Sequence, residues 1–258
     1  MILTADYHTH TTYSHGKGSV LDNALVAKEK GLKQVGITDH GFAHPAFGLT
    51  KRKISSLVKD CREATEKTGV EVLVGIESNI IGVDGTVDLK SKIYDDFDIF
   101  LAGFHKFVLY KPGTMFSTFI PNFLRSTFNS TTASKSLIKR NTKAYINVIK
   151  NNPVDVITHL NFCVYADAVE VAKCASDYGT YIELNSKKTH LTDDELFAIS
   201  KTGVNFVIDS DAHSPDRVGE ISLIEKTLER VDIPKERIMN IDGRLPDFRF
   251  ARYKGGNK

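Results

Sequence analysis

Histidine and carboxylate residues in this chain recur at the points where short apolar runs end. The first two histidines form the triplet His8-Thr9-His10, and Asp211-Ala212-His213 repeats that spacing farther along. Residues two apart on an extended strand point to the same side, so each pair can hold one ion. Imidazole and carboxylate groups are ligands of zinc, manganese and iron, and catalytic sites keep coordination positions open for water. The spacing therefore predicts a metal centre.

Five further residues of the same kind follow other apolar runs or lie in the loops after them. The full candidate ligand set is His8, His10, His15, His40, Glu77, His105, His159, Asp211 and His213. This set exceeds what one ion needs, so we expect two or three metals bridged by a carboxylate such as Glu77 or Asp211. The alternative for any single histidine is a strand cap or a bond to the backbone, which explains the joint placement poorly. His44 and His190 fall outside the pattern, and we expect them on the surface or in loops.

Closely spaced metals favour the hydrolysis of phosphate esters, because one ion lowers the pKa of a bound water while the others hold phosphoryl oxygens. Metal-bound hydroxide would then be the nucleophile. The sequence has neither a GxxxxGK[ST] phosphate loop nor a GxGxxG dinucleotide motif, which argues against a kinase or a dehydrogenase. Cys61, Cys163 and Cys174 are widely spaced and odd in number, which is typical of reduced thiols in a cytosolic protein.

Seven strand-like runs, each ending in a polar or ligand-capable residue, cover residues 2–7, 34–38, 71–76, 98–103, 154–158, 180–184 and 204–210. Helical periodicity and helix punctuation separate them, at residues 19–30, 50–68, 131–151, 167–178, 192–202 and 215–231. Strand and helix alternate, which predicts an α/β fold, best a closed barrel of seven βα units. A run at 238–241 is only a weak candidate for an eighth strand. In such barrels the loops after the strands converge on one face, where catalytic residues gather.

Length and composition favour one soluble domain over residues 1–258. The net charge is +2 with 26% charged residues, so neither a strongly basic nucleic-acid surface nor an acidic tail is indicated. We see no signal peptide and no apolar run of membrane-spanning length, so we expect a cytoplasmic protein without membrane contact. The expected partner is a small phosphorylated substrate, nucleic acid is not expected, and a homo-oligomer stays open.

Taken together, these segments resemble the polymerase and histidinol phosphatase (PHP) superfamily of metal-dependent phosphoesterases. The segments that carry the resemblance are ADYHTHTTYSHG at 5–16, GITDHG at 36–41, GIESNIIGVDG at 75–85, AGFHK at 102–106, ITH at 157–159 and DSDAHSPDRVG at 209–219. They span nearly the whole chain, and the resemblance is greatest to the stand-alone bacterial phosphatases. It implies a distorted (βα)7 barrel with the active site at the C-terminal ends of the strands.

The resemblance also implies how nine residues share three metals. One metal would be held by His8, His10, Glu77 and Asp211, a second by Glu77, His105 and His159, and a third by His15, His40 and His213. All nine positions are filled here, which favours a competent site.

The sequence leaves two questions about the surroundings of these ligands open, the geometry of the loop at His159 and the role of Asp39. The chain continues His159 with Leu160 and Asn161 where relatives often have proline, so the geometry of that loop is open. Asp39 precedes His40 and is a catalytic candidate beside Glu77. It could orient the His40 ring or give a proton to the leaving oxygen, or it could be a loop cap.

An aromatic-rich insert at about 106–130 follows His105 and is longer than an ordinary βα loop. Its aromatic residues are Phe107, Tyr110, Phe116, Phe119, Phe123 and Phe128. Such an insert could form a lid or a wall for an apolar part of the substrate. Alternatively, it packs on the barrel or forms a subunit contact.

Cationic residues that could bind the phosphate group are Lys17, Lys106, Arg125, Arg140 and Arg217, although each alone could equally be a solvated charge. The sequence thus predicts a metal-dependent phosphoric ester hydrolase for a small phosphomonoester, with histidinol phosphate as one candidate substrate. One alternative is a nuclease or phosphodiesterase of the same superfamily, which the near-neutral charge disfavours. Another is a non-catalytic metal-binding regulatory module, which should have lost ligands.

Overall fold

Seven short parallel strands form the centre of the molecule. The computed structural model describes residues 1–127 and 133–256. The strands are β1 (Ala5–Thr9), β2 (Gln34–Ile37), β3 (Glu71–Asn79), β4 (Ile99–Gly103), β5 (Val156–Ile157), β6 (Tyr181–Asn185) and β7 (Phe206–Asp209). Each strand pairs in parallel with the next one along the chain, from β1 to β7. The predicted α/β class and seven-stranded barrel are confirmed.

The sheet nearly closes between β7 and β1. A parallel bridge joins Thr9 to Ala212 at the C-terminal ends of these strands. At the other end, the run expected as a weak eighth strand forms only isolated bridges, one of them between Leu3 and Ile241. The Asn240 amide donates hydrogen bonds to the carbonyls of Ala5 (2.8 Å) and Ile208 (2.7 Å). This run therefore connects the first and last strands at that end, because it bonds to both.

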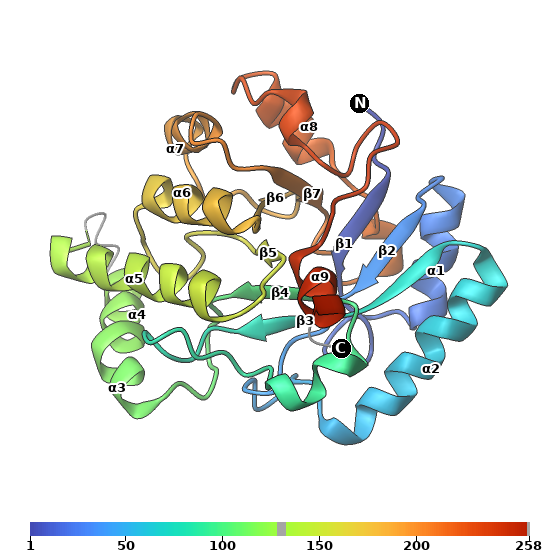
Figure 1. Ribbon diagram of the computed structural model, residues 1–258, viewed down its shortest axis with the longest axis horizontal. Coiled ribbons are helices and arrows are strands. Elements are labelled where there is room, and N and C mark those ends of the chain that lie inside the picture. The colour runs from blue at the N-terminus through green and yellow to red at the C-terminus, as the bar shows by residue number, and fades with distance from the viewer. Residues whose placement is uncertain (128–132, 257–258) are drawn as a thin grey trace.

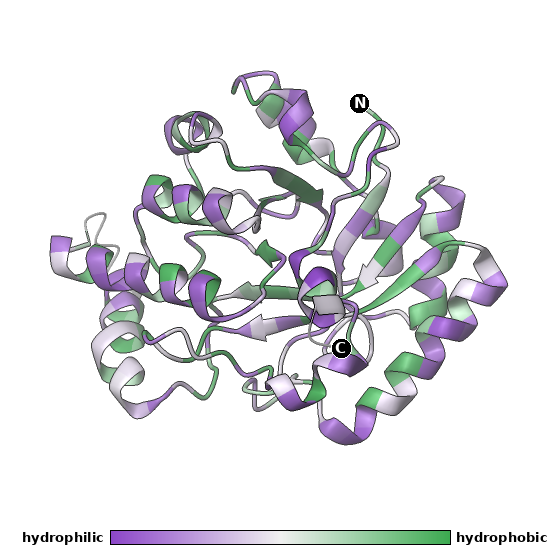
Figure 2. Cartoon of the chain, in the orientation of Figure 1, coloured by the Kyte–Doolittle hydropathy of each residue, from purple (hydrophilic) through white to green (hydrophobic). Residues whose placement is uncertain are grey.

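Helices surround the strands (Figure 1). The larger ones are α1 (Val20–Glu29), α2 (Lys51–Thr68), α5 (Lys135–Asn151), α6 (Ala168–Tyr178), α7 (Asp193–Ser200) and α8 (Ser222–Leu228). Shorter 3-10 segments are η1 (Ser91–Asp96), η3 (Pro215–Arg217) and η4 (Lys235–Arg237). Hydrophobic residues concentrate on the strands and on the helix faces toward them, whereas hydrophilic residues face outward (Figure 2). The main core therefore lies between the strands and the surrounding helices.

The C-terminal helix α9 (Arg249–Gly256) covers the N-terminal end of the barrel and lies in front of the strands in Figure 1. The Phe248 ring, just before this helix, packs edge to face on Tyr7 with the ring centroids 4.9 Å apart. The Phe250 amide donates a 2.8 Å hydrogen bond to Asp155, just before β5. Because this end is plugged, the opposite end is the one open for a site.

Two of the expected helices have different bounds in the structure. The expected helix at 215–231 is broken into η3 and α8, because Val218 is buried and Gly219 takes a left-handed φ of 69° between them. The insert after His105 is largely helical, with α3 (Pro112–Thr114), the π-helical η2 (Met115–Phe119) and α4 (Ile120–Thr127). The expected helix at 131–151 begins at Lys135, after Ser134 as its cap. Phe128 and residues 131–132 lie outside the described residues.

Candidate metal centre

The nine candidate ligands come together at the C-terminal ends of the strands. His8 lies in β1 and Glu77 in β3, and the other seven lie in loops that follow strands. One cavity of about 420 Å³ is lined by His15, His40, Glu77, His105, His159, Asp211 and His213. His8 and His10 are fully buried behind these residues. Residues up to 205 positions apart in the sequence are thus gathered in one place, from His8 to His213.

Glu77 lies at the centre of this cluster and has no exposed surface. Its Oε1 atom lies 2.7 Å from Nε2 of His159 and 2.9 Å from Nε2 of His105. The same oxygen lies 3.3 Å from Nε2 of His8, while Oε2 lies 2.8 Å from Nδ1 of His40. One carboxylate therefore faces nitrogens from four loops or strands, which is the arrangement that a bridging ligand requires.

A second group of ligand atoms surrounds Asp211. Nε2 of His8 and Nε2 of His10 face each other at 3.1 Å. Asp211 Oδ1 lies 3.8 Å from the first of these nitrogens and 3.5 Å from the second. Ligand atoms about 2.0 Å from a tetrahedral zinc ion lie roughly 3.3 Å from one another. The spacing of His8, His10 and Asp211 therefore fits coordination of one ion.

The hydrogen bonding of the cluster is incomplete in a way that a cation would complete. Nδ1 of His40 and Oε2 of Glu77 are buried and have no hydrogen-bond partner among the described residues. These two atoms are only 2.8 Å apart, yet they do not meet in hydrogen-bonding geometry. Leaving such atoms unsatisfied costs about 1–3 kcal/mol each. The donor set, imidazole nitrogen and carboxylate oxygen, is the one that zinc, manganese and iron accept, so the residues fit the implied metals.

A third group forms around His40 and differs in part from the expected one. His40 and His213 lie within ligand distance of His10, and His40 also groups with Glu77 and His105. His15 is exposed, and its ring centroid lies 4.8 Å from that of His40 and 4.3 Å from that of His213. The expected trio is therefore assembled, while His10 and Glu77 connect it to the other two groups.

The protonation states of Glu77, Asp211 and His10 suit metal binding. Burial alone raises the pKa of Glu77, but the charges of His105 and His8 lower it more, so its pKa lies well below the ordinary value. At Asp211, burial alone likewise raises the pKa, but His8 and His10 lower it more. The pKa of Asp211 therefore also lies well below its ordinary value. Burial lowers the pKa of His10 far below that of free imidazole. Ionised carboxylates and neutral imidazoles are the forms that coordinate divalent cations.

Glu183, in β6, is a further member of the site that the sequence reasoning missed. It is buried, and its Oε1 lies 2.5 Å from Nδ1 of His8. Its Oε2 accepts hydrogen bonds from the backbone amide of His159 (2.5 Å) and from the side chain of Asn185 (3.0 Å). Burial alone lowers the pKa of His8, but Glu77 and Glu183 outweigh it and raise that pKa well above its ordinary value. The surroundings of His8 therefore favour positive charge.

The loop after β5 brings His159 to Glu77 although it lacks the proline expected there. His159, Asn161 and Cys163 all take positive φ values, of 30°, 72° and 64°. Such values are uncommon for residues other than glycine and mark a tightly constrained loop. Gly103 permits the approach, because a Cβ atom there would lie 2.7 Å from Cε1 of His159. The loop geometry left open by the sequence is thus compatible with a ligand at this position.

Asp39, a catalytic candidate from the sequence, faces away from the cavity. Its Oδ1 accepts hydrogen bonds from the Thr11 amide (2.8 Å) and the Ser14 hydroxyl (2.5 Å). Its Oδ2 accepts one from the Thr11 hydroxyl at 2.6 Å. Asp39 is fully buried and does not line the cavity. This placement favours the loop cap among the alternatives, because the carboxylate fixes the segment between His10 and His15.

Of the cationic candidates, only Lys106 lines the cavity. Lys17 is exposed outside it, and Arg217 is exposed in η3. The guanidinium of Arg140 donates to the Ser117 carbonyl, and Arg125 lies 5.8 Å from the ring centroid of Tyr165. Neither arginine lines the cavity, because Arg140 lies in α5 and bonds to the insert, and Arg125 lies in α4.

Several lining residues were not expected from the sequence. They are Lys187 and Lys188 after β6, the aromatic residues Phe47 and Phe162, and the histidines His44 and His190. His44 and His190 do lie in loops, as expected, but those loops border the cavity. Burial lowers the pKa of His190 to about 4. No local pattern marks these positions, since their common feature is proximity in the fold.

The aromatic insert contributes to the cavity at one end only. Phe107 lines the cavity and is 65% exposed. The Tyr110 hydroxyl donates a 2.5 Å hydrogen bond to the His105 carbonyl, and its ring stacks on Phe119 with centroids 4.9 Å apart. Phe116 is 71% exposed on the outside of the insert. Each of the two alternatives from the sequence therefore applies to a different residue. Phe107 forms part of the cavity wall, and Tyr110 packs within the insert.

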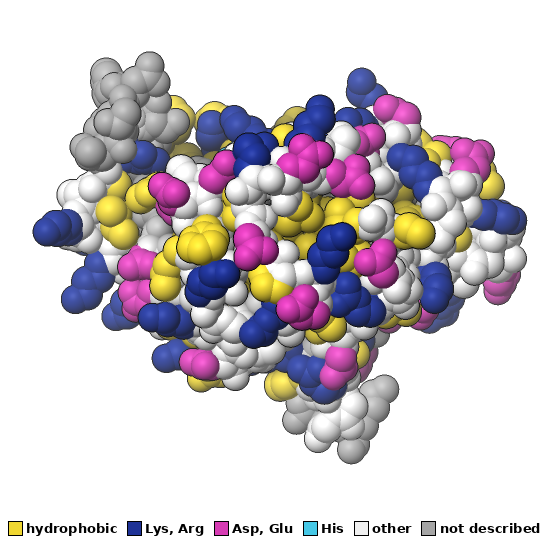
Figure 3. Space-filling view, turned by 90° about the horizontal axis from the view of Figure 1, so that it is seen from above, with side chains coloured by type: hydrophobic (Ala, Val, Ile, Leu, Met, Phe, Trp, Pro, Cys, Tyr) yellow, Lys and Arg dark blue, Asp and Glu magenta, His cyan; other side chains and the backbone are white. Residues whose placement is uncertain are grey.

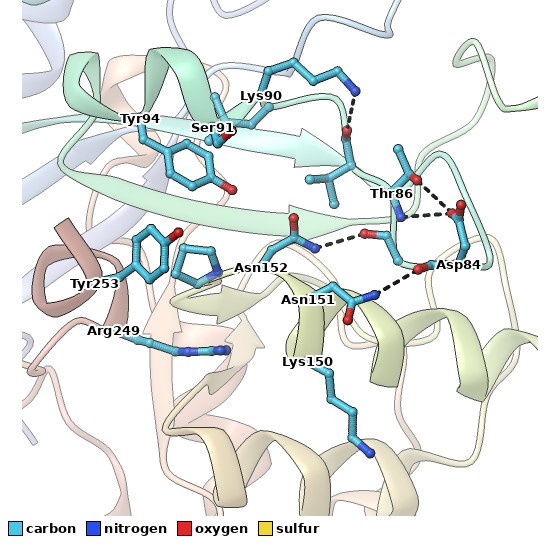
Figure 4. A pocket seen from close by; sticks show the side chains of 14 residues that line it. Asp84, Thr86, Lys90, Ser91, Tyr94, Lys150, Asn151, Asn152, Arg249 and Tyr253 are labelled. Carbon is cyan, nitrogen blue, oxygen red and sulfur yellow. Dashed lines mark hydrogen bonds between the residues drawn. The ribbon is translucent and has the colours of Figure 1, made fainter. Parts of the chain in front are cut away.

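A second cavity, of about 440 Å³, lies away from the histidines beside η1 and α9. Tyr94 and Tyr253 line one side of it, while the ammonium ends of Lys90 and Lys150 extend away from the tyrosines at separate places (Figure 4). Asp84 is paired with Lys111, which lies outside this lining. The cavity has no convergent group of charged side chains, in contrast to the one around Glu77.

Comparison with known proteins places the chain in a family. The PHP domain family model matches residues 6–210. The chain belongs to the PHP domain family. It is 32% identical to a "probable phosphatase" of Thermoanaerobacter sp. strain X514, over 96% of this chain and 95% of that protein. It is also 32% identical to a "probable phosphatase" of Caldanaerobacter subterraneus subsp. tengcongensis, over 92% and 87% of the two chains. The predicted family is confirmed, and these names agree with the expected enzyme class, a metal-dependent phosphoric ester hydrolase.

The fold also resembles that of a solved PHP-type enzyme. The crystal structure of histidinol phosphate phosphatase from Lactococcus lactis, in complex with zinc, L-histidinol and phosphate, superposes with a TM-score of 0.62. The match covers 96% of this chain and all of that chain, with 14% sequence identity. At this identity the likeness is one of fold. Among the described residues, no helix is both long and apolar enough to cross a membrane.

Proposed function

We propose that this chain is a metal-dependent phosphatase that hydrolyses a small phosphomonoester in the cavity around Glu77. The observation that carries the proposal is the convergence of imidazole and carboxylate groups on one buried carboxylate, with lysines lining the same cavity. Two or three divalent cations, zinc, manganese or iron, would be held by the nine candidate ligands. The names of the relatives support the same enzyme class.

When bound, the metals supply Lewis-acid stabilisation of the phosphoryl oxygens and a water of lowered pKa. The residues of the chain supply the rest. Lys187, with Nζ 3.4 Å from Asp211 Oδ1, can donate hydrogen bonds to phosphoryl oxygens that lie against the ligand cluster. Phe107 and Phe162 line the cavity and offer apolar surface to the leaving group. Glu77 and Glu183 hold the ligand rings in place.

The two alternatives receive less support. The near-neutral net charge of +2 disfavours a nucleic-acid substrate, and the face seen in Figure 3 carries basic and acidic side chains interspersed. A non-catalytic module should have lost ligands, whereas the nine candidates all belong to one connected cluster. A small ester is therefore favoured over a polymeric one.

The proposal is tested with protein loaded separately with zinc, manganese or iron and with protein stripped by a chelator. Substrates are 4-nitrophenyl phosphate, a panel of phosphorylated metabolites including histidinol phosphate, and bis(4-nitrophenyl) phosphate as a diester. We expect hydrolysis of monoesters over the diester, loss of activity on stripping, and two or three metals per chain by elemental analysis. Metal-loaded protein that hydrolyses no monoester would overturn the proposal.

A further inference from the structure

Apart from the candidate metal ligands, the charged side chains that line the cavity around Glu77 are all lysines. Its carboxylates are Glu77 and Asp211, and both belong to the candidate ligand cluster. Its lysines are Lys106, Lys187 and Lys188. Glu183 is close by, but its oxygens are engaged by His8 and two other partners. A substrate group that projects from the metal cluster toward the rim therefore meets ammonium groups and no available carboxylate among the described lining residues.

The two adjacent lysines are held in place by the same framework as the ligands. The backbone amides of Lys187 and Lys188 both donate 3.0 Å hydrogen bonds to Oδ1 of Asn185. The amide nitrogen of Asn185 in turn donates to Glu183 (3.0 Å) and to Asp211 Oδ2 (3.3 Å). The turn that carries both lysines is therefore fixed relative to Asp211, so their placement beside the cavity is a property of the fold.

The three lysines are all exposed but differ in their contacts. Lys187 Nζ lies 3.1 Å from Nδ1 of His213 and 3.4 Å from Asp211 Oδ1, within reach of the ligand cluster. In the described part of the chain, no carboxylate lies within ion-pairing distance of Lys106 or Lys188. Lys106 Nζ lies 5.9 Å from the centroid of the Phe162 ring. Lys187 is therefore suited to the phosphoryl group, and the other two lysines to the rest of the substrate.

Aromatic rings line the cavity beside Lys106 and Lys188. The rings of Phe162 and His190 lie 4.9 Å apart, and the charge of Lys188 acts on His190. Phe47 and Phe107 add apolar surface to the same cavity. The part of the substrate that leaves with the ester oxygen would thus lie against rings and end between cations.

We propose that the substrate is a phosphomonoester whose leaving group has a flat apolar body and carries a second anionic group, a carboxylate or a phosphate. This inference rests on the function proposed above and narrows it to a substrate class. It separates the chain from an enzyme for cationic amino-alcohol phosphates such as histidinol phosphate, because an ammonium group on the leaving side would face Lys106 and Lys188 without a counter-ion.

The test uses four phenyl phosphates that differ only in the para substituent. The substituents are methyl, aminomethyl, carboxymethyl and phosphonomethyl, in which the methylene group keeps the acidity of the phenols similar. With metal-loaded protein we expect kcat/KM for the two anionic esters to exceed that of the aminomethyl ester by at least about tenfold, with the methyl ester between them. The ratio between the carboxymethyl and phosphonomethyl esters then distinguishes a carboxylate from a phosphate as the second anion.

Variants assign this preference to the lysines. In the Lys106→Gln, Lys188→Gln double variant, we expect the ratio between anionic and cationic esters to fall to within about threefold. Lys90→Gln, at the cavity beside η1, is the matched control and should retain the full ratio. Hydrolysis without a preference for anionic esters, or a preference that survives the double variant, would overturn this inference alone. Hydrolysis of other monoesters but of none of these four would also overturn this inference alone, whereas absence of hydrolysis of every monoester tested would overturn the proposed function itself.

Discussion

The carboxylate of Glu183 lies 2.5 Å from Nδ1 of His8, and neither residue is exposed to solvent at this contact. A histidine that binds a metal through Nε2 is commonly oriented by such a carboxylate at its other nitrogen, which also makes the ring a stronger ligand. The second oxygen of Glu183 accepts from the backbone amide of His159. One side chain thus fixes members of two of the expected ligand groups, which makes Glu183 a positioning residue.

We expect Glu183→Gln to weaken metal binding by about 10-fold to 100-fold and to lower kcat/KM in proportion, because loss of such a partner typically costs that much. The measurement is zinc affinity by chelator competition, together with thermal unfolding of the metal-free protein. Glu229→Gln, an exposed glutamate that follows α8, is the matched control. Unchanged affinity with a lowered unfolding temperature would show that Glu183 serves only the fold.

Replacement of Glu77 tests the centre of the cluster. We expect Glu77→Ala to lower kcat/KM by more than about a hundredfold and to reduce the number of bound metals. The reason is that loss of a residue that contacts the metals directly should cost more than loss of a residue that only orients a ligand. The barrel should remain folded, since the strands on both sides of β3 keep their pairing and core. Elemental analysis, circular dichroism and the 4-nitrophenyl phosphate assay check this. Retained activity would mean that the reaction occurs elsewhere.

Much of this site could be predicted from the sequence because parallel strands share one direction. Strand-like runs ending in His8, Glu77 or Asp211 can be recognised locally, and parallel packing then brings their ends together. The seven strands and the gathering of the nine candidate ligands follow from this rule. The fold therefore follows mainly from periodicity and from the placement of polar residues at strand ends.

The residues that the sequence did not reveal depend on contacts between distant segments. Glu183 is one residue in a short strand, and its role becomes visible only when the fold brings His8, on another strand, to within 2.5 Å of it. Gly219 looked compatible with a continuous helix, but the burial of Val218 redirects the chain there. Lys187 and Lys188 follow a strand without any motif, and the Asn185 turn alone directs them to the cavity.

Asp39 offers a test that separates a structural role from proton donation. We expect Asp39→Asn to lower the free energy of unfolding by about 1–3 kcal/mol, because a buried acceptor of three hydrogen bonds loses one oxygen. The shape of the pH dependence of kcat should be retained. Urea unfolding and pH-rate profiles are the measurements, with the exposed Asp232→Asn as control. Unchanged stability with a lost limb in the pH profile would instead identify Asp39 as a proton donor.

Asp155, at the end of the barrel opposite to the site, should make stability depend on pH. Burial raises the pKa of this carboxyl to about 7, although the amides of Phe250 and Phe100 donate to it and oppose the shift. In the folded state the group is therefore protonated below about pH 7, whereas in the unfolded chain it ionises near its ordinary value. Unfolding releases a proton between these two values, so the contribution to stability is full at low pH and is lost as the pH rises to about 7.

A shift of this size corresponds to about 4 kcal/mol at most. Between pH 4.5 and 7.5 we expect the advantage of the natural chain over Asp155→Asn in unfolding free energy to shrink by about 2–3 kcal/mol. Urea unfolding of both metal-free proteins measures this difference, because all other titrating groups, including the ligand histidines, are shared and cancel. Parallel pH profiles for the two proteins would show that Asp155 is ionised in the folded state and that its two amide donors outweigh burial.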